Sequence, residues 1–214
     1  MGTTHSMDVY LVRHGITSWN KEKRYLGHSD EPLLGSELHK LDPLRDALGR
    51  ITFDYCYSSD LKRCTETFRY LVKNKCDCFD PRLREIHFGD WEGLTYEQLK
   101  EDGHYQKWLN DWECVAPPNG ETFGQFNERI ASFLAEILLL TRPSNKVLIC
   151  THGGVIRSIL MNFAVTKALW ELPVEHAKGY RLSLQQQKGE WLCNSWSVVP
   201  IQEKDQLSGN DFQQ

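Results

Sequence analysis

The chain has 214 residues, enough to bury one sizeable hydrophobic core without help from disulfides or a structural metal. Hydrophobic residues make up 40% and charged residues 25%, which is typical of a globular protein and argues against disorder. The 25 Lys and Arg against 29 Asp and Glu give a net charge of −4. This balance disfavours a general nucleic-acid binder and a protein that docks on anionic membranes, because both need a basic face. No apolar run approaches the roughly 18–20 residues that span a bilayer.

The cysteines and the chain ends add little chemistry. The seven cysteines are scattered, and the Cys76/Cys78 pair has no matching second pair, so a zinc ribbon is not predicted. Reduced thiols in a cytoplasmic protein fit this pattern better. Residues 1–7 lack the apolar stretch of a signal peptide and resemble a cloning remnant. Without repeats or linkers, one domain over residues 8–200 is predicted, followed by a polar tail, 201–214, that frays.

The predicted elements alternate between strands and helices. Apolar runs at residues 9–12 and 147–150 predict buried parallel strands, because they are apolar throughout rather than alternating. A third strand is predicted at 53–57, and two more near the end are joined by a turn at 188–189. Apolar residues at helical spacing predict three helices between these strands, over 61–72, 123–138 and 155–163. This alternation predicts an α/β fold with three layers, α/β/α, around a mostly parallel central sheet.

Three predicted strands end in residues suited to phosphate chemistry. The first ends at Arg13-His14, the second runs into the segment 59–63, and the third ends at His152 before two glycines. Ligands of open α/β sheets bind at these strand ends, where the amides of following helices favour anions. The sequence therefore predicts that two histidines and two arginines converge on one pocket.

These residue types fit the transfer of a phosphoryl group. A phosphate monoester carries about −1.5 to −2 charges near neutral pH, so its pocket must be positively charged. The guanidinium groups of Arg13 and Arg63 supply permanent positive charge and paired hydrogen-bond donors. Their field lowers the pKa of a neighbouring histidine and leaves a ring nitrogen free to attack phosphorus. Either His14 or His152 can be that nucleophile while the other donates hydrogen bonds, and Glu85 is a candidate proton donor for the leaving group.

Four segments together resemble the histidine phosphatase superfamily, in its phosphoglycerate mutase-like branch. Residues 12–20 resemble its Arg-His-Gly-x-Thr-x-x-Asn signature, and residues 58–64, 83–93 and 151–157 resemble its later motifs, in the family's order. The resemblance implies a phosphoglycerate mutase-like fold and a phosphohistidine intermediate, with no metal and no cofactor. It assigns the roles as follows: His14 is phosphorylated; Arg13, Arg63 and His152 grip the phosphoryl group; Asn20 assists; Glu85 acts as acid and then as base.

The resemblance also narrows the reaction. The Tyr-rich, basic insertion by which mutases of this type retain a bisphosphate is absent after the Glu85 motif, so hydrolysis is predicted over mutase activity. The segment 108–123 is similar to α-ribazole phosphatases, which implies hydrolysis of α-ribazole 5′-phosphate in cobalamin biosynthesis. The alternatives are a broad-specificity phosphatase, a phosphoglycerate mutase, or a non-catalytic phosphate-binding scaffold. In each enzymatic reading the partner is a small-molecule phosphomonoester, and no oligomeric state is predicted.

Two assignments stay open in the sequence. Glu92 or Asp90, in the same motif as Glu85, can also supply the proton. Trp108 and Trp112, four residues apart, can either stack on an aromatic base of the substrate or form one helix face packed on the core, and the second reading is favoured. A His/Glu metal site is not predicted, because the candidate ligands lack tight spacing.

Overall fold

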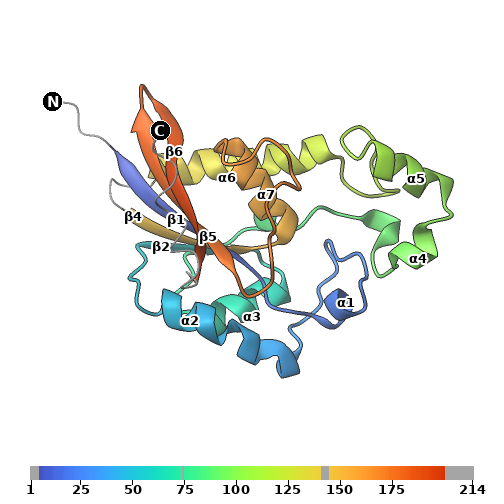
Figure 1. Ribbon diagram of the computed structural model, residues 1–214, viewed down its shortest axis with the longest axis horizontal. Helices are drawn as coiled ribbons and strands as arrows, with labels where there is room; N and C mark the ends of the chain where they lie inside the picture. The colour runs from blue at the N-terminus through green and yellow to red at the C-terminus, as the bar shows by residue number, and fades with distance from the viewer. Residues whose placement is uncertain (1–4, 74, 141–144, 201–214) are drawn as a thin grey trace, which may run out of the picture.

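The computed structural model describes residues 5–73, 75–140 and 145–200. Its centre is a six-stranded sheet with the order β3-β2-β4-β1-β5-β6 (Figure 1). The strands are β1 (Ser6–Arg13), β2 (Tyr55–Ser58), β3 (Cys78–Phe79), β4 (Asn145–Thr151), β5 (Gly179–Gln187) and β6 (Glu190–Val199). The first four strands in this order pair in parallel, whereas β5 pairs antiparallel with both β1 and β6. The sheet is therefore mixed and mostly parallel, as predicted.

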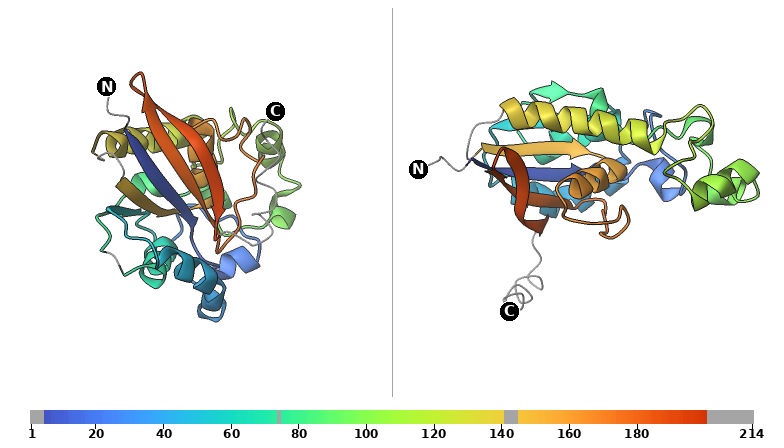
Figure 2. Two further views of the ribbon diagram at one scale, coloured as in Figure 1. Left: turned by 60° about the vertical axis from the view of Figure 1, so that its left-hand side comes forward. Right: turned by 90° about the horizontal axis from the view of Figure 1, so that it is seen from above.

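Helices cover both faces of the sheet (Figure 2). The α-helices are α1 (Ser18–Lys21), α2 (Asp42–Leu48), α3 (Lys62–Leu71), α4 (Tyr96–Leu99), α5 (Gly103–Asn110), α6 (Phe123–Leu140) and α7 (Gly153–Asn162). Three short 3₁₀ helices are η1 (Gly35–Leu41), η2 (Pro81–Leu83) and η3 (Gly89–Trp91). With α6 and α7 on one face and α2 and α3 on the other, the three-layer α/β/α architecture is confirmed.

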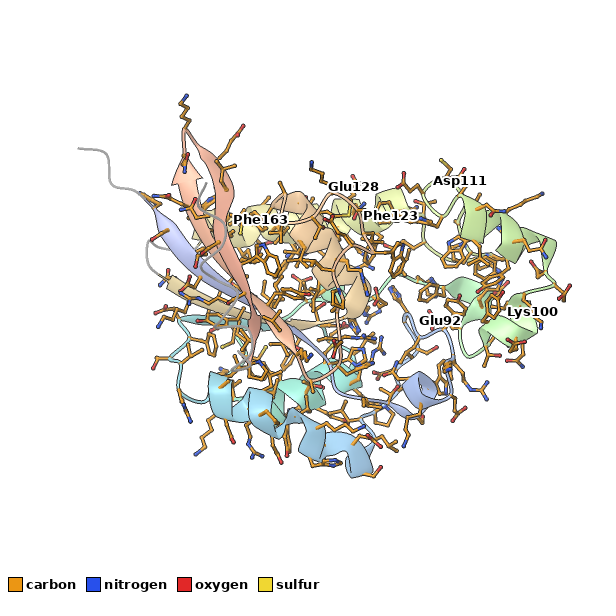
Figure 3. The ribbon with its side chains drawn as sticks, in the orientation of Figure 1. Glu92, Lys100, Asp111, Phe123, Glu128 and Phe163 are labelled. Atoms are coloured by element: carbon orange, nitrogen blue, oxygen red, sulfur yellow. The ribbon has the colours of Figure 1, made fainter. Side chains whose placement is uncertain are left out.

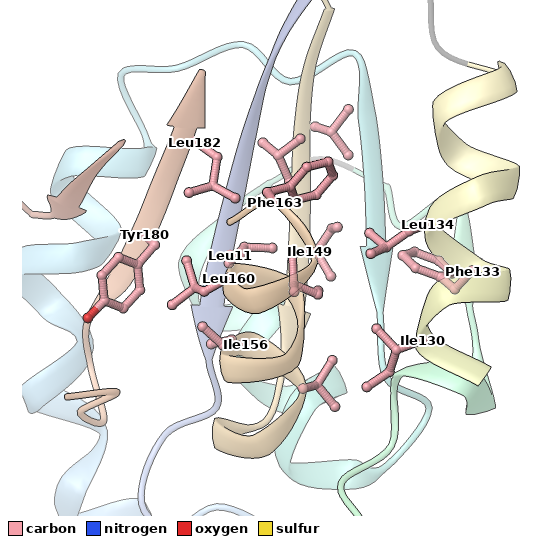
Figure 4. Packing of buried hydrophobic residues seen from close by; sticks show 14 of the residues in the cluster. Leu11, Ile130, Phe133, Leu134, Ile149, Ile156, Leu160, Phe163, Tyr180 and Leu182 are labelled. Carbon is pink, nitrogen blue, oxygen red and sulfur yellow. The ribbon is translucent and has the colours of Figure 1, made fainter. Parts of the chain in front are cut away.

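The apolar strands feed two separate cores. In β1, Val9 and Leu11 belong to the cluster under α6 and α7, whereas Tyr10 and Val12 belong to the cluster under α2 and α3. Successive side chains of a strand point to opposite faces, so a strand covered on both sides must be apolar throughout. Figure 4 shows the first cluster, in which Phe133 of α6 and Ile156 of α7 pack over the sheet. This packing fixes the strand ends that carry the site.

The predicted element bounds are close to the observed ones. The run at 9–12 lies inside a longer strand that begins at Ser6 and pairs with β5 at Gln185. The predicted helices correspond to α3, α6 and α7, and the predicted turn lies between β5 and β6, where Lys188 and Gly189 both have positive φ. Residues 1–4 of the predicted remnant and the predicted tail, 201–214, lie outside the described residues.

A small helical subdomain lies beyond the carboxyl ends of the parallel strands, to the right in Figure 1. It comprises η3, α4 and α5, and its own core is an aromatic cluster around buried Trp91 and Tyr105. Gly89 starts η3 with φ +53°, and a side chain there would overlap the backbone at Pro118. This close approach places the subdomain beside the start of α6, across from the strand ends.

Candidate active site

The ends of β1 and β4 bring two histidines together. The two strands run in parallel register up to Arg13 opposite Thr151, and the His14 amide donates to the Thr151 carbonyl at 2.9 Å. Both strands end there, and the centroids of the His14 and His152 rings lie 5.1 Å apart. The predicted convergence of the two strand-end histidines is thus present in the structure.

His14 has an open nitrogen. Its Nδ1 lies 2.7 Å from the Gly15 carbonyl oxygen, which can only accept, so Nδ1 carries the proton and Nε2 keeps its lone pair. No hydrogen bond to Nε2 is formed by residues 5–73, 75–140 or 145–200. Burial, followed by the charge of Arg63, holds the pKa of His14 well below its usual value. The ring is therefore neutral at neutral pH with a nucleophilic nitrogen available.

His152 has the opposite arrangement. Its Nδ1 accepts from Arg63 Nε at 3.3 Å, and its Nε2 donates to Ser59 Oγ at 2.9 Å. Burial and the Arg63 charge also lower the pKa of His152. The lone pair of this ring is therefore occupied, and its Nε2 proton is bonded to Ser59. This difference between the two rings favours His14 as nucleophile and His152 as hydrogen-bond donor.

Two buried guanidinium groups make the site cationic. Arg63, in the first turn of α3, is fully buried, and its terminal nitrogens donate to the carbonyls of Ser29 and Gly27 at 2.7 and 2.6 Å. Arg13 donates to the Val174 carbonyl at 2.6 Å, and its Nε is buried without a partner. Burial lowers the pKa of Arg13 to about 10, which leaves it charged at neutral pH. Neither arginine forms an ion pair with any residue of the described ranges, so an anionic ligand would supply the missing countercharge.

Glu85 lies at the mouth of this cationic site. One carboxylate oxygen accepts from the Gly154 amide at the start of α7 at 2.9 Å, and the other accepts from the Ile86 amide at 3.0 Å. The backbone of the segment is fixed by Arg129 of α6, which donates to the carbonyl of Glu85 at 2.9 Å. A helix N-terminus favours a carboxylate at this position and orients it. Glu85 also lines the cavity described below.

The other two acids of the motif are engaged elsewhere. Glu92 accepts from the amides of His28 and Ser29 at 2.7 and 2.6 Å, and thereby holds the loop that follows α1 (Figure 3). Asp90 is exposed and accepts from Asn119 at 3.0 Å. Of the three acids, Glu85 lines the cavity described below, and Glu92 and Asp90 do not.

Gly154→Ala is expected to lower kcat about 10- to 100-fold, because an added Cβ would overlap a Glu85 carboxylate oxygen and move it from its position. The melting temperature should change little, since the displaced atoms are the far end of a flexible side chain. Steady-state kinetics and thermal melts of this variant would be compared with Gly124→Ala, where an added Cβ meets only Thr122 Oγ1, at 3.9 Å. A Gly154→Ala enzyme with unchanged kcat would contradict this placement of Glu85.

Asn20 has a structural partner in this structure. Its side-chain Oδ1 accepts from the Thr17 backbone amide at 3.1 Å, and its backbone amide donates to Thr17 Oγ1 at 3.2 Å. These two bonds form the capping box of α1. No hydrogen bond joins Asn20 to His14 or Arg63 within the described part of the chain. Its predicted assistance to the phosphoryl group remains a prediction.

One residue of the site was not predicted from the sequence. His176, in the loop before β5, donates from Nδ1 to the His14 carbonyl at 2.9 Å, and its ring lies 5.3 Å from the His14 ring. A lone histidine in a long loop carries no periodicity or motif, so only the fold reveals its position.

An aromatic cavity of about 400 Å³ opens beside the cationic site. Arg13, Glu85, Gly153, Gly154 and Arg157 form its polar side. Its apolar wall comes from the loop after α1, the segment next to Glu85, the subdomain with the segment that follows it, α6 and the loop after α7. It consists of Tyr25, Ile86, Phe88, Trp108, Leu109, Trp112, Phe123, Phe126, Leu169 and Trp170. A larger groove, between α2 and α3, contains none of the predicted site residues.

The favoured reading of the tryptophan pair was wrong. Helix α5 ends at Asn110, so Trp108 and Trp112 do not share one helix face. Trp108 packs in the aromatic cluster against Trp91. Trp112 instead packs edge-on against Phe123, with 4.4 Å between the ring centroids. The residue after the helix, Asp111, leaves the helical conformation with φ −148° and redirects the chain. Both tryptophans thereby line the cavity.

Two other kinds of feature are absent from the part of the chain that the structure describes. Within residues 5–73, 75–140 and 145–200, no cluster of three or more His, Cys, Asp or Glu side chains is arranged to bind a metal ion. Over the same residues, no helix has both the length and the apolar character needed to cross a membrane.

Comparison with known proteins explains this combination of residues. The family described as the histidine phosphatase superfamily (branch 1) matches residues 9–198, nearly the whole chain. The chain belongs to this superfamily. It is therefore a phosphatase or mutase of the histidine phosphatase family, and the family implies a phosphorylated small-molecule substrate.

Relatives in the superfamily have different activities. The chain is 30% identical to adenosylcobalamin/alpha-ribazole phosphatase of Escherichia coli over 79% of this chain and 86% of the relative. It is 29% identical to the probable phosphoglycerate mutase GpmB of Enterobacter sp. over 90% and 91%.

The crystal structure of a putative alpha-ribazole-5′-P phosphatase from Escherichia coli matches with a TM-score of 0.76 at 28% identity, over 88% of this chain and 96% of that one. TTHB049 from Thermus thermophilus matches with a TM-score of 0.65 at 33% identity, over 82% and 93%. These likenesses establish the shared fold and leave the substrate open.

Proposed function

We propose that this histidine phosphatase hydrolyses a phosphomonoester whose leaving group is bulky and aromatic, with α-ribazole 5′-phosphate as the substrate that fits best. The observation that carries the proposal is the aromatic cavity, which adjoins the buried cations and Glu85. A substrate that places its phosphate against Arg13 and Arg63 would extend its leaving group into this cavity.

The first half of the reaction uses the open nitrogen of His14. The Nε2 lone pair attacks phosphorus, a nitrogen–phosphorus bond forms, and the bond from phosphorus to the ester oxygen breaks. Glu85 in its acid form gives its proton to the departing oxygen. Arg13 and Arg63 stabilise the charge on the phosphoryl oxygens as the bonds change, and His152 joins them by turning its Nε2 proton from Ser59 Oγ to a phosphoryl oxygen.

The second half returns the enzyme to its starting state. Glu85, now a carboxylate, takes a proton from a water molecule, whose oxygen attacks phosphorus. The nitrogen–phosphorus bond breaks, inorganic phosphate forms, and the His14 lone pair is restored. One acid thus serves both steps, as the contacts of Glu92 and Asp90 with other parts of the protein also suggest.

The composition of the cavity supports hydrolysis of an alkyl phosphate that carries an aromatic group, in preference to mutase activity. A phosphoglycerate is small and carries a carboxylate in addition to its phosphate, so its site would need polar and cationic walls. Among the described residues that line the cavity, ten are apolar or aromatic and two, Arg13 and Arg157, are cations. The Arg157 guanidinium itself lies 4.8 Å from the ring centre of Trp170. These surfaces suit the fused aromatic base of α-ribazole.

Phosphate release in the presence of EDTA tests the proposal. The substrates are α-ribazole 5′-phosphate, 3-phosphoglycerate and p-nitrophenyl phosphate. A kcat/KM for the first that is far above the other two supports the assignment. Similar slow hydrolysis of all three would leave a broad-specificity phosphatase, and phosphate binding without turnover would indicate a scaffold. Production of 2-phosphoglycerate from the second substrate would indicate the mutase.

Trp112→Ala is expected to lower kcat/KM for α-ribazole 5′-phosphate roughly tenfold or more, because an aromatic contact in the cavity is lost. The value for 3-phosphoglycerate should change less than twofold. Trp196→Phe serves as a control, since Trp196 is on β6 and does not line the cavity. An equal loss for both substrates would contradict a role of Trp112 in leaving-group recognition.

A further inference from the structure

His176 is held against the reacting histidine by several contacts. Its own Nδ1 donates to the His14 carbonyl at 2.9 Å. Two residues earlier, the Val174 carbonyl accepts from Arg13 at 2.6 Å, and the Pro173 carbonyl accepts from Tyr180 Oη at 2.6 Å. The loop before β5 is therefore fixed to both residues of the Arg13-His14 pair, and the position of the His176 ring follows from the fold.

The outer nitrogen of His176 is unused. A carbonyl oxygen can only accept, so Nδ1 carries the proton and Nε2 has a lone pair. Nε2 forms no hydrogen bond with the described residues, and it is not fully buried. It is thus accessible to solvent, on a ring whose centre lies 5.3 Å from the centre of the His14 ring.

The binding of a substrate would change the net charge around His176 from positive to negative. Arg13 at the end of β1 and Lys40 on η1 face the ring as cations, and the neighbouring His14 is neutral. On its own loop, Glu175 and Lys178 pair with each other at 3.0 Å. Burial and the Arg13 charge lower the pKa of His176 to about 4, so the free protein keeps this ring neutral. A phosphoryl dianion at His14 would introduce two negative charges into the same space and favour protonation.

We infer that His176 is a third histidine of the phosphoryl site: it takes up a proton when the phosphate binds and donates it from Nε2 as a hydrogen bond to a phosphoryl oxygen. This inference rests on the proposed phosphohistidine chemistry at His14. The proton comes from solvent and returns there when phosphate leaves, so His176 forms no covalent bond. It adds a charge-assisted hydrogen bond only when the dianion is present.

His176→Asn separates this role from simple support of the loop. The asparagine amide nitrogen replaces Nδ1 and keeps the donor to the His14 carbonyl, but no group replaces Nε2. Glu175→Gln is the matched control, because it alters the adjacent, exposed residue and leaves the ring intact. Thermal melts of both variants establish that the fold is retained.

Binding of inorganic phosphate, measured by calorimetry in two buffers of different ionisation heat, gives the affinity and the number of protons taken up. For His176→Asn we expect phosphate affinity to fall roughly 10- to 100-fold and proton uptake to fall by about one. The kcat/KM for p-nitrophenyl phosphate should fall in parallel, whereas Glu175→Gln should match the wild type.

Three outcomes would overturn the inference. Wild-type affinity and proton uptake in His176→Asn would show that Nε2 takes no part. If that variant does not fold, NMR of ¹⁵N-histidine-labelled wild-type protein replaces it, and a His176 pKa unchanged by saturating phosphate would refute the proton uptake. A wild-type protein that binds no phosphate would remove the proposed function together with the inference.

Discussion

Replacement of His14 by alanine is expected to lower phosphate release by more than about 10⁴-fold for every phosphomonoester, because the nucleophile itself is removed. The other contacts of the phosphate site, from Arg13, Arg63 and His152, remain, so the variant should still bind inorganic phosphate. Removal of a buried ring also costs stability, and thermal melts of the variant establish whether it is folded when assayed.

The matched comparison is His152→Ala. We propose His152 as a hydrogen-bond donor rather than the nucleophile, so its loss should slow the reaction without abolishing it. Residual activity in His14→Ala above that of His152→Ala would reverse the two assignments.

Glu85→Gln is expected to lower kcat about 10²- to 10⁴-fold for an alkyl phosphate such as α-ribazole 5′-phosphate, because the leaving alkoxide is no longer protonated. With p-nitrophenyl phosphate, Glu85→Gln should lower the rate of the first chemical step much less, since p-nitrophenolate departs without a proton. Burst kinetics with this substrate separates phosphorylation of the enzyme from hydrolysis of the intermediate.

Glu92→Gln provides the control for that result. Glu92 holds the loop whose carbonyls bind Arg63, so its replacement should affect both substrates alike. If the dependence on the leaving group appeared in Glu92→Gln and not in Glu85→Gln, the identity of the acid would be wrong.

The sequence predicts the strand ends well, for a physical reason. A strand buried on both faces must be apolar, and the first polar residues after it mark the edge of the sheet. That rule places Arg13 and His14 beside His152, although about 140 residues separate the two histidines along the chain. In the structure the rings of His14 and His152 are in contact. The roles of the two histidines do not follow from residue types, because they depend on which ring nitrogen already has a partner.

Other parts of the site depend on long-range packing. His176 comes to the site because β5 returns antiparallel beside β1, and a loop with no repeating pattern precedes it. The apolar wall of the cavity combines five separate segments of chain, and the end of α5 at Asn110 redirects Trp112 toward Phe123. A helical reading of the four-residue spacing could not anticipate that termination, because Asp111 is compatible with either conformation.

His14 is expected to carry the phosphoryl group during turnover. Rapid quenching of the wild-type enzyme with p-nitrophenyl phosphate at high pH, where phosphohistidine survives, followed by peptide mass spectrometry, tests it directly. We expect one phosphoryl group per chain, located on His14 and absent from His14→Ala. A phosphoryl group on His152, or on any other residue, would show that His14 is not the nucleophile.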